Sequence, residues 1–199
     1  MFENREKGAV LMEKIDPAQP PEAAKGRPGK DWKKELFSWI RTILGAVILF
    51  VLLTQFVVVN VTVPTGSMID TIEPGDRVMA LRVPYYFHPP ERGDIVVFYN
   101  PDDESELYIK RVVAVGGETV QGIDGAVYID GELLDEPYIY GAPSDSFGPY
   151  EVPEDCYFMM GDNREGSLDA RFWENKFVSR KKILGKAYFR YFPHVSGLE

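Results

Sequence analysis

The sequence predicts a mainly β protein: a compact folded sheet or barrel-like domain that follows one N-terminal transmembrane helix. Three observations lead to this fold class. A charge-free apolar run extends from residue 43 to residue 63, six short runs rich in valine and aromatic residues follow it, and no long amphipathic helix is evident among them. Gly, Pro and Asp residues, which favour turns, separate the six runs.

The N-terminal residues are polar and include the stretches D-P-A-Q-P-P-E and G-R-P-G. Such a segment has little apolar surface to bury, so we interpret residues 1–30 as a flexible tail. The predicted organisation continues with a juxtamembrane segment and single transmembrane helix over residues 31–60. A β-rich domain over residues 61–199 completes it.

The apolar run I-L-G-A-V-I-L-F-V-L-L-T-Q-F-V-V-V-N-V-T-V is long enough to span a bilayer. Its 21 residues carry no charge. At about 1.5 Å per residue they extend about 30 Å, which is the thickness of the hydrocarbon core. Cations precede the run, so the positive-inside rule predicts a cytoplasmic N-terminus and an extracytoplasmic domain. These cations are Lys30, Lys33, Lys34 and Arg41. The alternative is a cleaved signal peptide, which the long tail and the lack of a clear small-x-small site before Val63 disfavour.

The six β-rich runs are predicted to be strands of one domain. In chain order they are D-R-V-M-A-L-R-V, G-D-I-V-V-F-Y, L-Y-I-K-R-V-V-A-V, G-A-V-Y-I-D-G-E-L-L, C-Y-F-M-M and I-L-G-K-A-Y-F-R-Y-F. In the fourth run, I-D-G-E indicates a tight hairpin turn around Asp130 and Gly131. The segment between the third run and Gly161 is short, so a large inserted domain is not expected.

Charge is distributed unevenly along the chain. Residues 1–63 carry nine Lys or Arg against seven Asp or Glu, whereas the remainder carries thirteen against twenty-four. A strongly acidic domain argues against nucleic acid as a partner. The single cysteine, Cys156, excludes an intrachain disulfide framework, and we interpret it as a packing residue.

One serine stands in a setting that suggests chemistry: Ser67, in V-T-V-P-T-G-S-M directly after the apolar run. A serine hydroxyl is a weak nucleophile and needs a base. His88 and His194 lack a convincing context, but Lys110 interrupts the apolar strand L-Y-I-K-R-V-V-A-V, where a lysine loses water. Desolvation lowers the pKa of a lysine, and only the neutral amine accepts a proton. Strand alternation directs Lys110 and Arg111 to opposite faces. Ser67 is therefore a candidate nucleophile and Lys110 its candidate base.

A third stretch, G-D-N-R-E-G-S-L-D-A-R, extends from Gly161 to Arg171. Together with P-T-G-S-M and Y-I-K-R-V-V-A-V-G-G-E in the same order, it makes the chain resemble the bacterial type I signal peptidases from the apolar run to about Tyr191. The resemblance implies a membrane-bound serine endopeptidase that removes signal peptides from exported preproteins, with Ser67 as nucleophile and Lys110 as general base. It implies neither metal nor other cofactor.

The same resemblance assigns supporting roles. The side chain of Thr65 and the main-chain N–H of Ser67 correspond to the oxyanion hole, and Ser167 corresponds to a serine that orients the lysine amine. Charged residues around them are expected to act as scaffold, with Arg111 pairing with Asp162; these residues are Asp162, Asp169, Arg171 and Arg111. Shallow pockets for small side chains are expected where an extended peptide adds as a strand. The matching positions are Val63, Pro64, Met68, Tyr108 and Ile109.

The expected partners are signal peptides and membrane lipid, at the outer face of the cytoplasmic membrane and beside the secretion translocon. Two departures from the family pattern concern geometry and substrate preference: Ala170 replaces a frequent serine, and a frequent proline after Met68 is missing. Other classes fit less well. A self-cleaving repressor lacks the anchor, a penicillin-binding protein needs more than the S-x-x-K of Ser179 to Lys182, and a sortase needs a T-L-x-T-C context around its cysteine. A non-catalytic, membrane-anchored β-domain scaffold remains the alternative.

Overall fold

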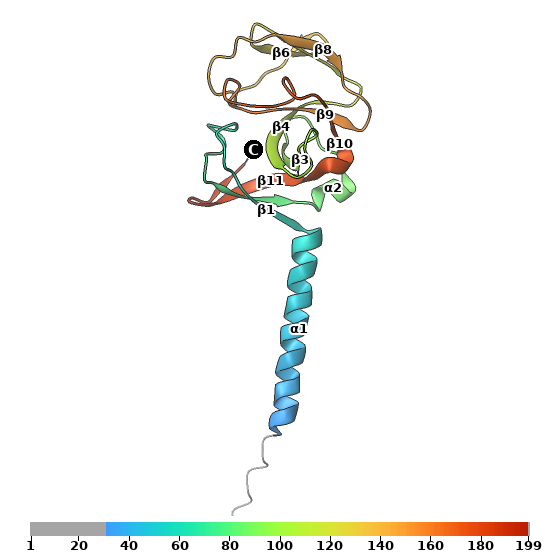
Figure 1. Ribbon diagram of the computed structural model, residues 1–199, viewed down its shortest axis with the longest axis vertical. Coiled ribbons are helices and arrows are strands. Elements are labelled where there is room, and N and C mark those ends of the chain that lie inside the picture. The colour runs from blue at the N-terminus through green and yellow to red at the C-terminus, as the bar shows by residue number, and fades with distance from the viewer. Residues whose placement is uncertain (1–30, 199) are drawn as a thin grey trace, which may run out of the picture. The chain divides into compact units, whose positions relative to one another are not determined.

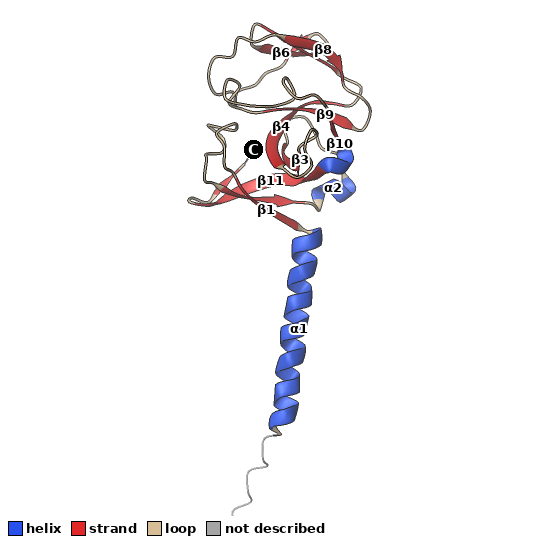
Figure 2. Ribbon diagram, viewed as in Figure 1, coloured by secondary structure: helices blue, strands red, loops and turns tan. Residues whose placement is uncertain are grey.

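The computed structural model describes residues 31–198, so the predicted tail over residues 1–30 lies outside the described residues. The described residues fall into two units, residues 31–43 and residues 44–198. The described part of the first unit is the beginning of helix α1. The second unit contains the end of this helix and all the strands, which Figure 2 shows in red.

The described chain is mainly β with one long N-terminal helix, which confirms the predicted fold class (Figure 1). The strands are β1 (Val58–Thr62), β2 (Arg77–Leu81), β3 (Ile95–Tyr99), β4 (Leu107–Val115), β5 (Thr119–Ile123), β6 (Ala126–Ile129), β7 (Glu132–Leu133), β8 (Phe147–Glu151), β9 (Cys156–Met160), β10 (Val178–Ser179), β11 (Ile183–Phe192) and β12 (Ser196–Gly197). The helices are α1 (Trp32–Phe56), the short α2 (Pro84–Phe87) and the single 3-10 turn η1 (Arg180–Lys182).

Helix α1 begins earlier and ends earlier than the apolar run suggested. Its 25 residues run from Trp32 to Phe56 and are long and apolar enough to cross a membrane. The prediction that the transmembrane segment continues to residue 60 is wrong, because Val58–Thr62 form β1 and pair antiparallel with β2. All the valines of the segment 57–63 are half-buried or buried, and Val59 and Val63 lie in a hydrophobic core. Core packing therefore decides its conformation.

The strands form two antiparallel sheets. The first has the order β1-β2-β11-β3-β4-β9-β10, with β12 paired to β11, and the second has the order β7-β6-β5-β8. In Figure 1 the path from β9 through β4, β3 and β11 to β1 can be followed across the first sheet. The edge strands β1 and β10 do not pair with each other, so this is a folded sheet and not a closed barrel.

The second sheet is a small insertion between β4 and β9, formed by residues 116–155. The hairpin predicted within it is confirmed: Asp130 and Gly131 have φ values of 51° and 83°, as a tight turn of this type requires, and they join β6 to β7. An equivalent Asp124–Gly125 turn joins β5 to β6. All six predicted runs contain strands, and the insertion contributes the additional strands β5 and β8.

The first sheet has a hydrophobic core on each face. In β3, four consecutive residues are buried; Val96 and Phe98 belong to one core, and Ile95 and Val97 belong to the other. Burial on both faces explains why this strand is continuously apolar instead of alternating. Strand β4 pairs beside β3 and therefore runs between two water-excluding layers, which is the setting in which Lys110 lies.

Candidate active site

The segment that carries Ser67, which we call the serine loop (residues 63–76), connects β1 to β2. Its ends are closed by two main-chain hydrogen bonds, from Val63 N–H to the Asp76 carbonyl (2.9 Å) and from Gly75 N–H to the Val63 carbonyl (2.7 Å). Met68 and Ile72 are fully buried in the core and anchor the loop. The nucleophile candidate is thus held by packing on its C-terminal side and by the β1–β2 ladder at its base.

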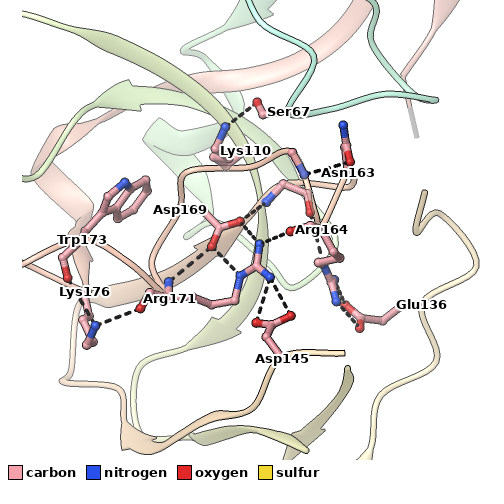
Figure 3. A network of polar contacts seen from close by, with 12 residues as sticks. Ser67, Lys110, Glu136, Asp145, Asn163, Arg164, Asp169, Arg171, Trp173 and Lys176 are labelled. Atoms are coloured by element: carbon pink, nitrogen blue, oxygen red, sulfur yellow. Dashed lines mark hydrogen bonds and ion pairs between the residues drawn. The ribbon is translucent and has the colours of Figure 1, made fainter. Parts of the chain in front are cut away.

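Lys110 reaches Ser67 from the middle of β4. Its Nζ lies 2.5 Å from Ser67 Oγ, and both residues are only 4% exposed (Figure 3). Lys110 is opposite Val96 in β3 and Arg111 is opposite Ile95, and these two apolar residues belong to different cores. Since residues opposite each other share a face, Lys110 and Arg111 point to opposite sides of the sheet, as alternation predicts. The structure therefore joins two side chains that are 43 positions apart in the sequence.

Burial changes the proton affinity of the lysine. Desolvation lowers the pKa of Lys110 from its usual 10.5 to about 8, against the opposing carboxylates of Asp169 and Asp162 and with a smaller lowering by Arg171. With a pKa of about 8, roughly a tenth of the lysine is neutral at pH 7. An amine in this state can accept a proton from the adjacent hydroxyl.

Asp162 is fully buried and forms a two-point ion pair with Arg111, from Nε to Oδ1 (2.9 Å) and from Nη2 to Oδ2 (2.7 Å). The same carboxylate accepts a hydrogen bond from the Thr71 hydroxyl of the serine loop (2.6 Å). Arg111 also donates to the Gly93 carbonyl (2.8 Å). This pair therefore ties strand β4 to the serine loop through the segment 161–171, which we call the GDN loop.

A second ion pair shapes the GDN loop itself (Figure 3). Arg171 donates from Nε and Nη2 to the two carboxylate oxygens of Asp169, each at 2.8 Å, and also contacts Asp145. Asp169 Oδ2 in turn accepts a hydrogen bond from Gly161 N–H (3.0 Å). These hydrogen bonds fix the start of the GDN loop beside Ser67.

Only glycine fits at position 161, because neighbouring atoms occupy the space that a side chain would need. A Cβ built there would lie 2.3 Å from the Ser67 carbonyl oxygen and 2.3 Å from Ser167 Oγ. Any side chain would push the GDN loop away from the serine loop.

Ser167 does not make the hydrogen bond to Lys110 that the family resemblance implies. Its Oγ is buried, next to Gly161, and has no hydrogen-bond partner among residues 31–198. Lys110 Nζ is directed to Ser67 instead. Ser167 thus adjoins the site without contacting the amine.

A cleft of about 250 Å³ opens beside the serine and lysine. It is lined by Val63, Pro64, Thr65, Ser67, Leu107, Tyr108, Ile109, Lys110, Gly166 and Leu168. Four of the five residues expected to bind substrate line it. Met68 does not: the prediction is wrong there, because Met68 is fully buried in the core beneath the serine loop. Thr65 is exposed at the cleft, beside Ser67.

Sequence reasoning missed the part played by Asn163 and by the ion pair of Arg164 with Glu136. Asn163 donates its side-chain amide to the Gly66 carbonyl (2.9 Å) and its main-chain N–H to the Ser67 carbonyl (3.1 Å). Arg164 and Glu136 are both nearly inaccessible to solvent and form a two-point pair that holds the other side of the GDN loop. Their only signal in the sequence is the N-R of G-D-N-R, which also fits a polar turn.

Ala170, the departure from the family pattern, is fully buried in a hydrophobic core. Its N–H donates to the Met159 carbonyl of β9 (3.1 Å). A methyl group suits this apolar position without leaving a hydroxyl to satisfy.

The chain is similar to known proteins over most of its length. Residues 36–192 match the family model described as signal peptidase, peptidase S26. A signal peptidase I of Leptolyngbya laminosa is 40% identical over 185 residues, which cover 89% of this chain and 87% of the relative. A signal peptidase I of Bacillus licheniformis is 34% identical over 171 residues, 81% of this chain and 91% of the relative. The crystal structure of a signal peptidase I from Enterococcus faecalis V583 is 30% identical with a TM-score of 0.43, covering 50% of this chain and 97% of that chain.

The family model and the curated relatives define a peptidase, and the N-terminal apolar helix fits a membrane-anchored protein. The chain belongs to the signal peptidase family, peptidase S26, and is a serine peptidase that removes signal peptides.

The lowered pKa of Lys110 predicts a pH-dependent cost in stability. Between pH 8 and 10.5 the unfolded chain binds more protons than the folded chain, so the free energy of unfolding rises with pH in this window. Below it, the folded state bears the whole cost of the buried charge, about 3 kcal/mol. Lys110→Met removes this cost, and we expect urea denaturation to show a gain in stability at pH 7 that shrinks as pH approaches 10.5.

The matched control is Lys181→Met, at an exposed lysine of η1. A Lys110→Met difference that is the same at both ends of the window would contradict the desolvated lysine.

Proposed function

We propose that Ser67 is the nucleophile and Lys110 the general base with which this peptidase cleaves signal peptides. The observation that carries the proposal is the 2.5 Å contact between Lys110 Nζ and Ser67 Oγ, two buried side chains at the edge of a cleft. The pKa of about 8 for Lys110 supports it, because this amine is partly neutral near physiological pH.

In the first step, Ser67 Oγ attacks the scissile carbonyl carbon while Lys110 Nζ takes the hydroxyl proton. The negative charge that develops on the carbonyl oxygen is stabilised by the Ser67 N–H and the Thr65 hydroxyl, which lies at the same cleft. The tetrahedral intermediate then collapses. The C–N bond breaks, the leaving amine receives the proton from Lys110, and the signal peptide remains as an ester on Ser67.

In the second step, Lys110 removes a proton from water as the water oxygen attacks the ester carbonyl. Collapse of this intermediate breaks the bond to Ser67 Oγ, which recovers its proton from the lysine. The free signal peptide leaves with a new carboxylate. One amine thus acts as base and acid in turn, and no redox or group-transfer partner is needed for either half-reaction to balance.

The cleft suits an extended peptide. The part of β4 from Leu107 to Lys110 pairs with β3 on one side, whereas pairing with β9 begins only at Arg111. An unpaired strand edge beside the serine offers main-chain donors and acceptors to a substrate added as a further strand. Val63, Pro64, Tyr108 and Ile109 form apolar walls that suit small side chains of the substrate.

The anchor fits a substrate held in a membrane. Ser67 follows Phe56, the last residue of α1, by only 11 positions, so it acts near the bilayer. Lys33, Lys34 and Arg41 lie in the first part of α1, which supports a cytoplasmic N-terminus and an extracytoplasmic catalytic domain. A signal peptide emerging from the secretion translocon meets the cleft at that face.

A non-catalytic scaffold is the competing interpretation. A scaffold has no need for a lysine desolvated against a serine, because burial of the amine costs stability and gives a scaffold no benefit. The scaffold interpretation predicts binding of partners without cleavage of a peptide bond.

Removing either member of the pair tests the proposal. We expect Ser67→Ala and Lys110→Ala to reduce cleavage of a preprotein, with alanine at the first and third positions before the cut, by more than about 10³-fold. The assay uses the purified full chain in detergent, and circular dichroism verifies folding.

The control pair is Ser179→Ala and Lys182→Ala, the serine and lysine with S-x-x-K spacing. Both are expected to cleave normally. Full activity in either Ser67→Ala or Lys110→Ala removes the proposed pair.

The orientation has its own test. In right-side-out cells with a permeable wall, added protease is expected to digest the domain that follows α1 and to spare the N-terminal residues. The reverse pattern, with digestion only in inside-out vesicles, overturns the extracytoplasmic placement while leaving the chemistry of the Ser67 and Lys110 pair intact.

A further inference from the structure

The side chain of Asn163 lies between the serine loop and the GDN loop, with its amide nitrogen pointing toward the serine loop in Figure 3. The side chain makes two hydrogen bonds: Nδ2 donates to the Gly66 carbonyl (2.9 Å) and Oδ1 accepts from Gly166 N–H (3.1 Å). The main chain of Asn163 makes two more, since its N–H donates to the Ser67 carbonyl (3.1 Å) and its carbonyl accepts from Gly166 N–H (3.2 Å). Asn163 therefore donates hydrogen bonds to the carbonyl oxygens of both Gly66 and Ser67.

The direction of the side-chain amide follows from its partners. Gly166 N–H is a donor only, so the atom facing it must be the carbonyl oxygen, Oδ1. This leaves Nδ2 for the Gly66 carbonyl, which is an acceptor only. Both contacts are satisfied in one orientation, and the flipped amide would lose both.

Two donors hold the Gly66 carbonyl and thereby orient the Ser67 N–H: Asn163 Nδ2 at 2.9 Å and the Ile69 N–H at the longer distance of 3.3 Å. The Gly66 carbonyl and the Ser67 N–H belong to the same planar peptide unit, which is trans, so the two groups point in opposite directions. Holding the oxygen toward Asn163 turns the N–H away from it. Among residues 31–198 the Ser67 N–H donates to no acceptor. The Ser67 N–H is thus available to a substrate, and hydrogen bonds to the Gly66 carbonyl, on the opposite side of the same peptide unit, restrict its direction.

We propose that Asn163 is a positioning residue: it clamps the peptide unit between Gly66 and Ser67 so that the Ser67 N–H is aimed at the oxygen of the scissile carbonyl. This inference rests on the proposed role of Ser67. Asn163 itself does not touch the reacting atoms, and it acts through the orientation of a donor. Its effect appears in the transition state, where charge develops on the carbonyl oxygen, more than in the binding of the uncleaved peptide.

Two substitutions separate this role from a purely structural one. Asn163→Asp keeps an oxygen acceptor for Gly166 N–H but sets a carboxylate oxygen against the Gly66 carbonyl, so the clamp is lost and repulsion takes its place. Asn163→Ala loses both side-chain bonds. If the side chain only braced Gly166, the Asp variant would retain activity and the Ala variant would not. Positioning of the Ser67 N–H predicts the opposite order, with Asp at least as impaired as Ala.

For Asn163→Asp and Asn163→Ala we expect a fall in kcat of about 10- to 100-fold, with KM changed by less than about 3-fold, measured with the full chain in detergent. The pH midpoint of kcat/KM is expected to stay that of the wild-type chain, because Asn163 makes no hydrogen bond to Lys110. The control is Asn175→Ala, an asparagine whose amide likewise donates to a main-chain carbonyl, that of Pro101, and which is expected to leave kcat unchanged.

A third variant moves Asn163 without altering it. A Cβ added at Gly166 would lie 2.5 Å from Asn163 Nδ2, which is the far end of a side chain and can shift. Gly166→Ala is therefore expected to lower kcat by displacing the amide. Combined with Asn163→Ala, which has no amide to displace, it is expected to add much less to the loss in kcat than it causes alone.

The outcomes separate this inference from the proposed function. If the wild type cleaves, Ser67→Ala does not, and Asn163→Asp retains wild-type kcat, the positioning role is wrong and the Ser67 proposal stands. A rise in KM without a fall in kcat, or a Gly166→Ala loss that persists undiminished beside Asn163→Ala, also overturns it. If Ser67→Ala cleaves normally, the proposed nucleophile fails first.

Discussion

The proposed chemistry depends on a single contact, the approach of the Lys110 amine to the Ser67 hydroxyl in surroundings that exclude water. A charged amine is unfavourable between two hydrophobic cores, and the same burial that costs stability lowers the pKa of the amine, as the proposed base requires. β4 supplies the amine from a strand with apolar layers on both sides, and the serine loop supplies the hydroxyl from a segment anchored by buried Met68. Neither group has this chemistry alone.

The charged residues around the contact stabilise its geometry. Asp162 joins Arg111 of β4 to Thr71 of the serine loop, and Asp169 joins Arg171 to the main chain at Gly161. Buried ion pairs contribute little net stability, because desolvation offsets their attraction, but they are costly to break singly. In this protein the ion pairs fix the relative positions of the segments that form the site. They hold three segments, distant in sequence, in one arrangement, and the GDN loop reaches both peptide units at Ser67 through Asn163.

The sequence was sufficient for the fold class, the six principal strands and the Asp130 turn, because alternation, valine-rich runs and Asp-Gly pairs are local signals. It misplaced the end of α1, since the valines of residues 57–63 are as apolar as lipid-facing residues and only pairing with β2 distinguishes them. Met68 was misassigned for the same reason: composition does not say whether an apolar side chain faces a cleft or a core. Asn163 was overlooked because its proposed role depends on the direction of two hydrogen bonds, and no local sequence pattern indicates this direction. The meeting of serine and lysine was suggested by family motifs and required the fold to bring them together.

The most direct test of this account is the titration of Lys110 itself. In the intact enzyme in detergent, with lysine labelled at ¹³Cε, the Lys110 resonance can be identified by its absence from the spectrum of Lys110→Met. A desolvated Lys110 is expected to titrate with a midpoint of about 8, well below the 10.5 of an ordinary lysine. A midpoint near 10.5 would show that the amine is solvated and charged at neutral pH, and would contradict the proposal that it serves as the base for Ser67.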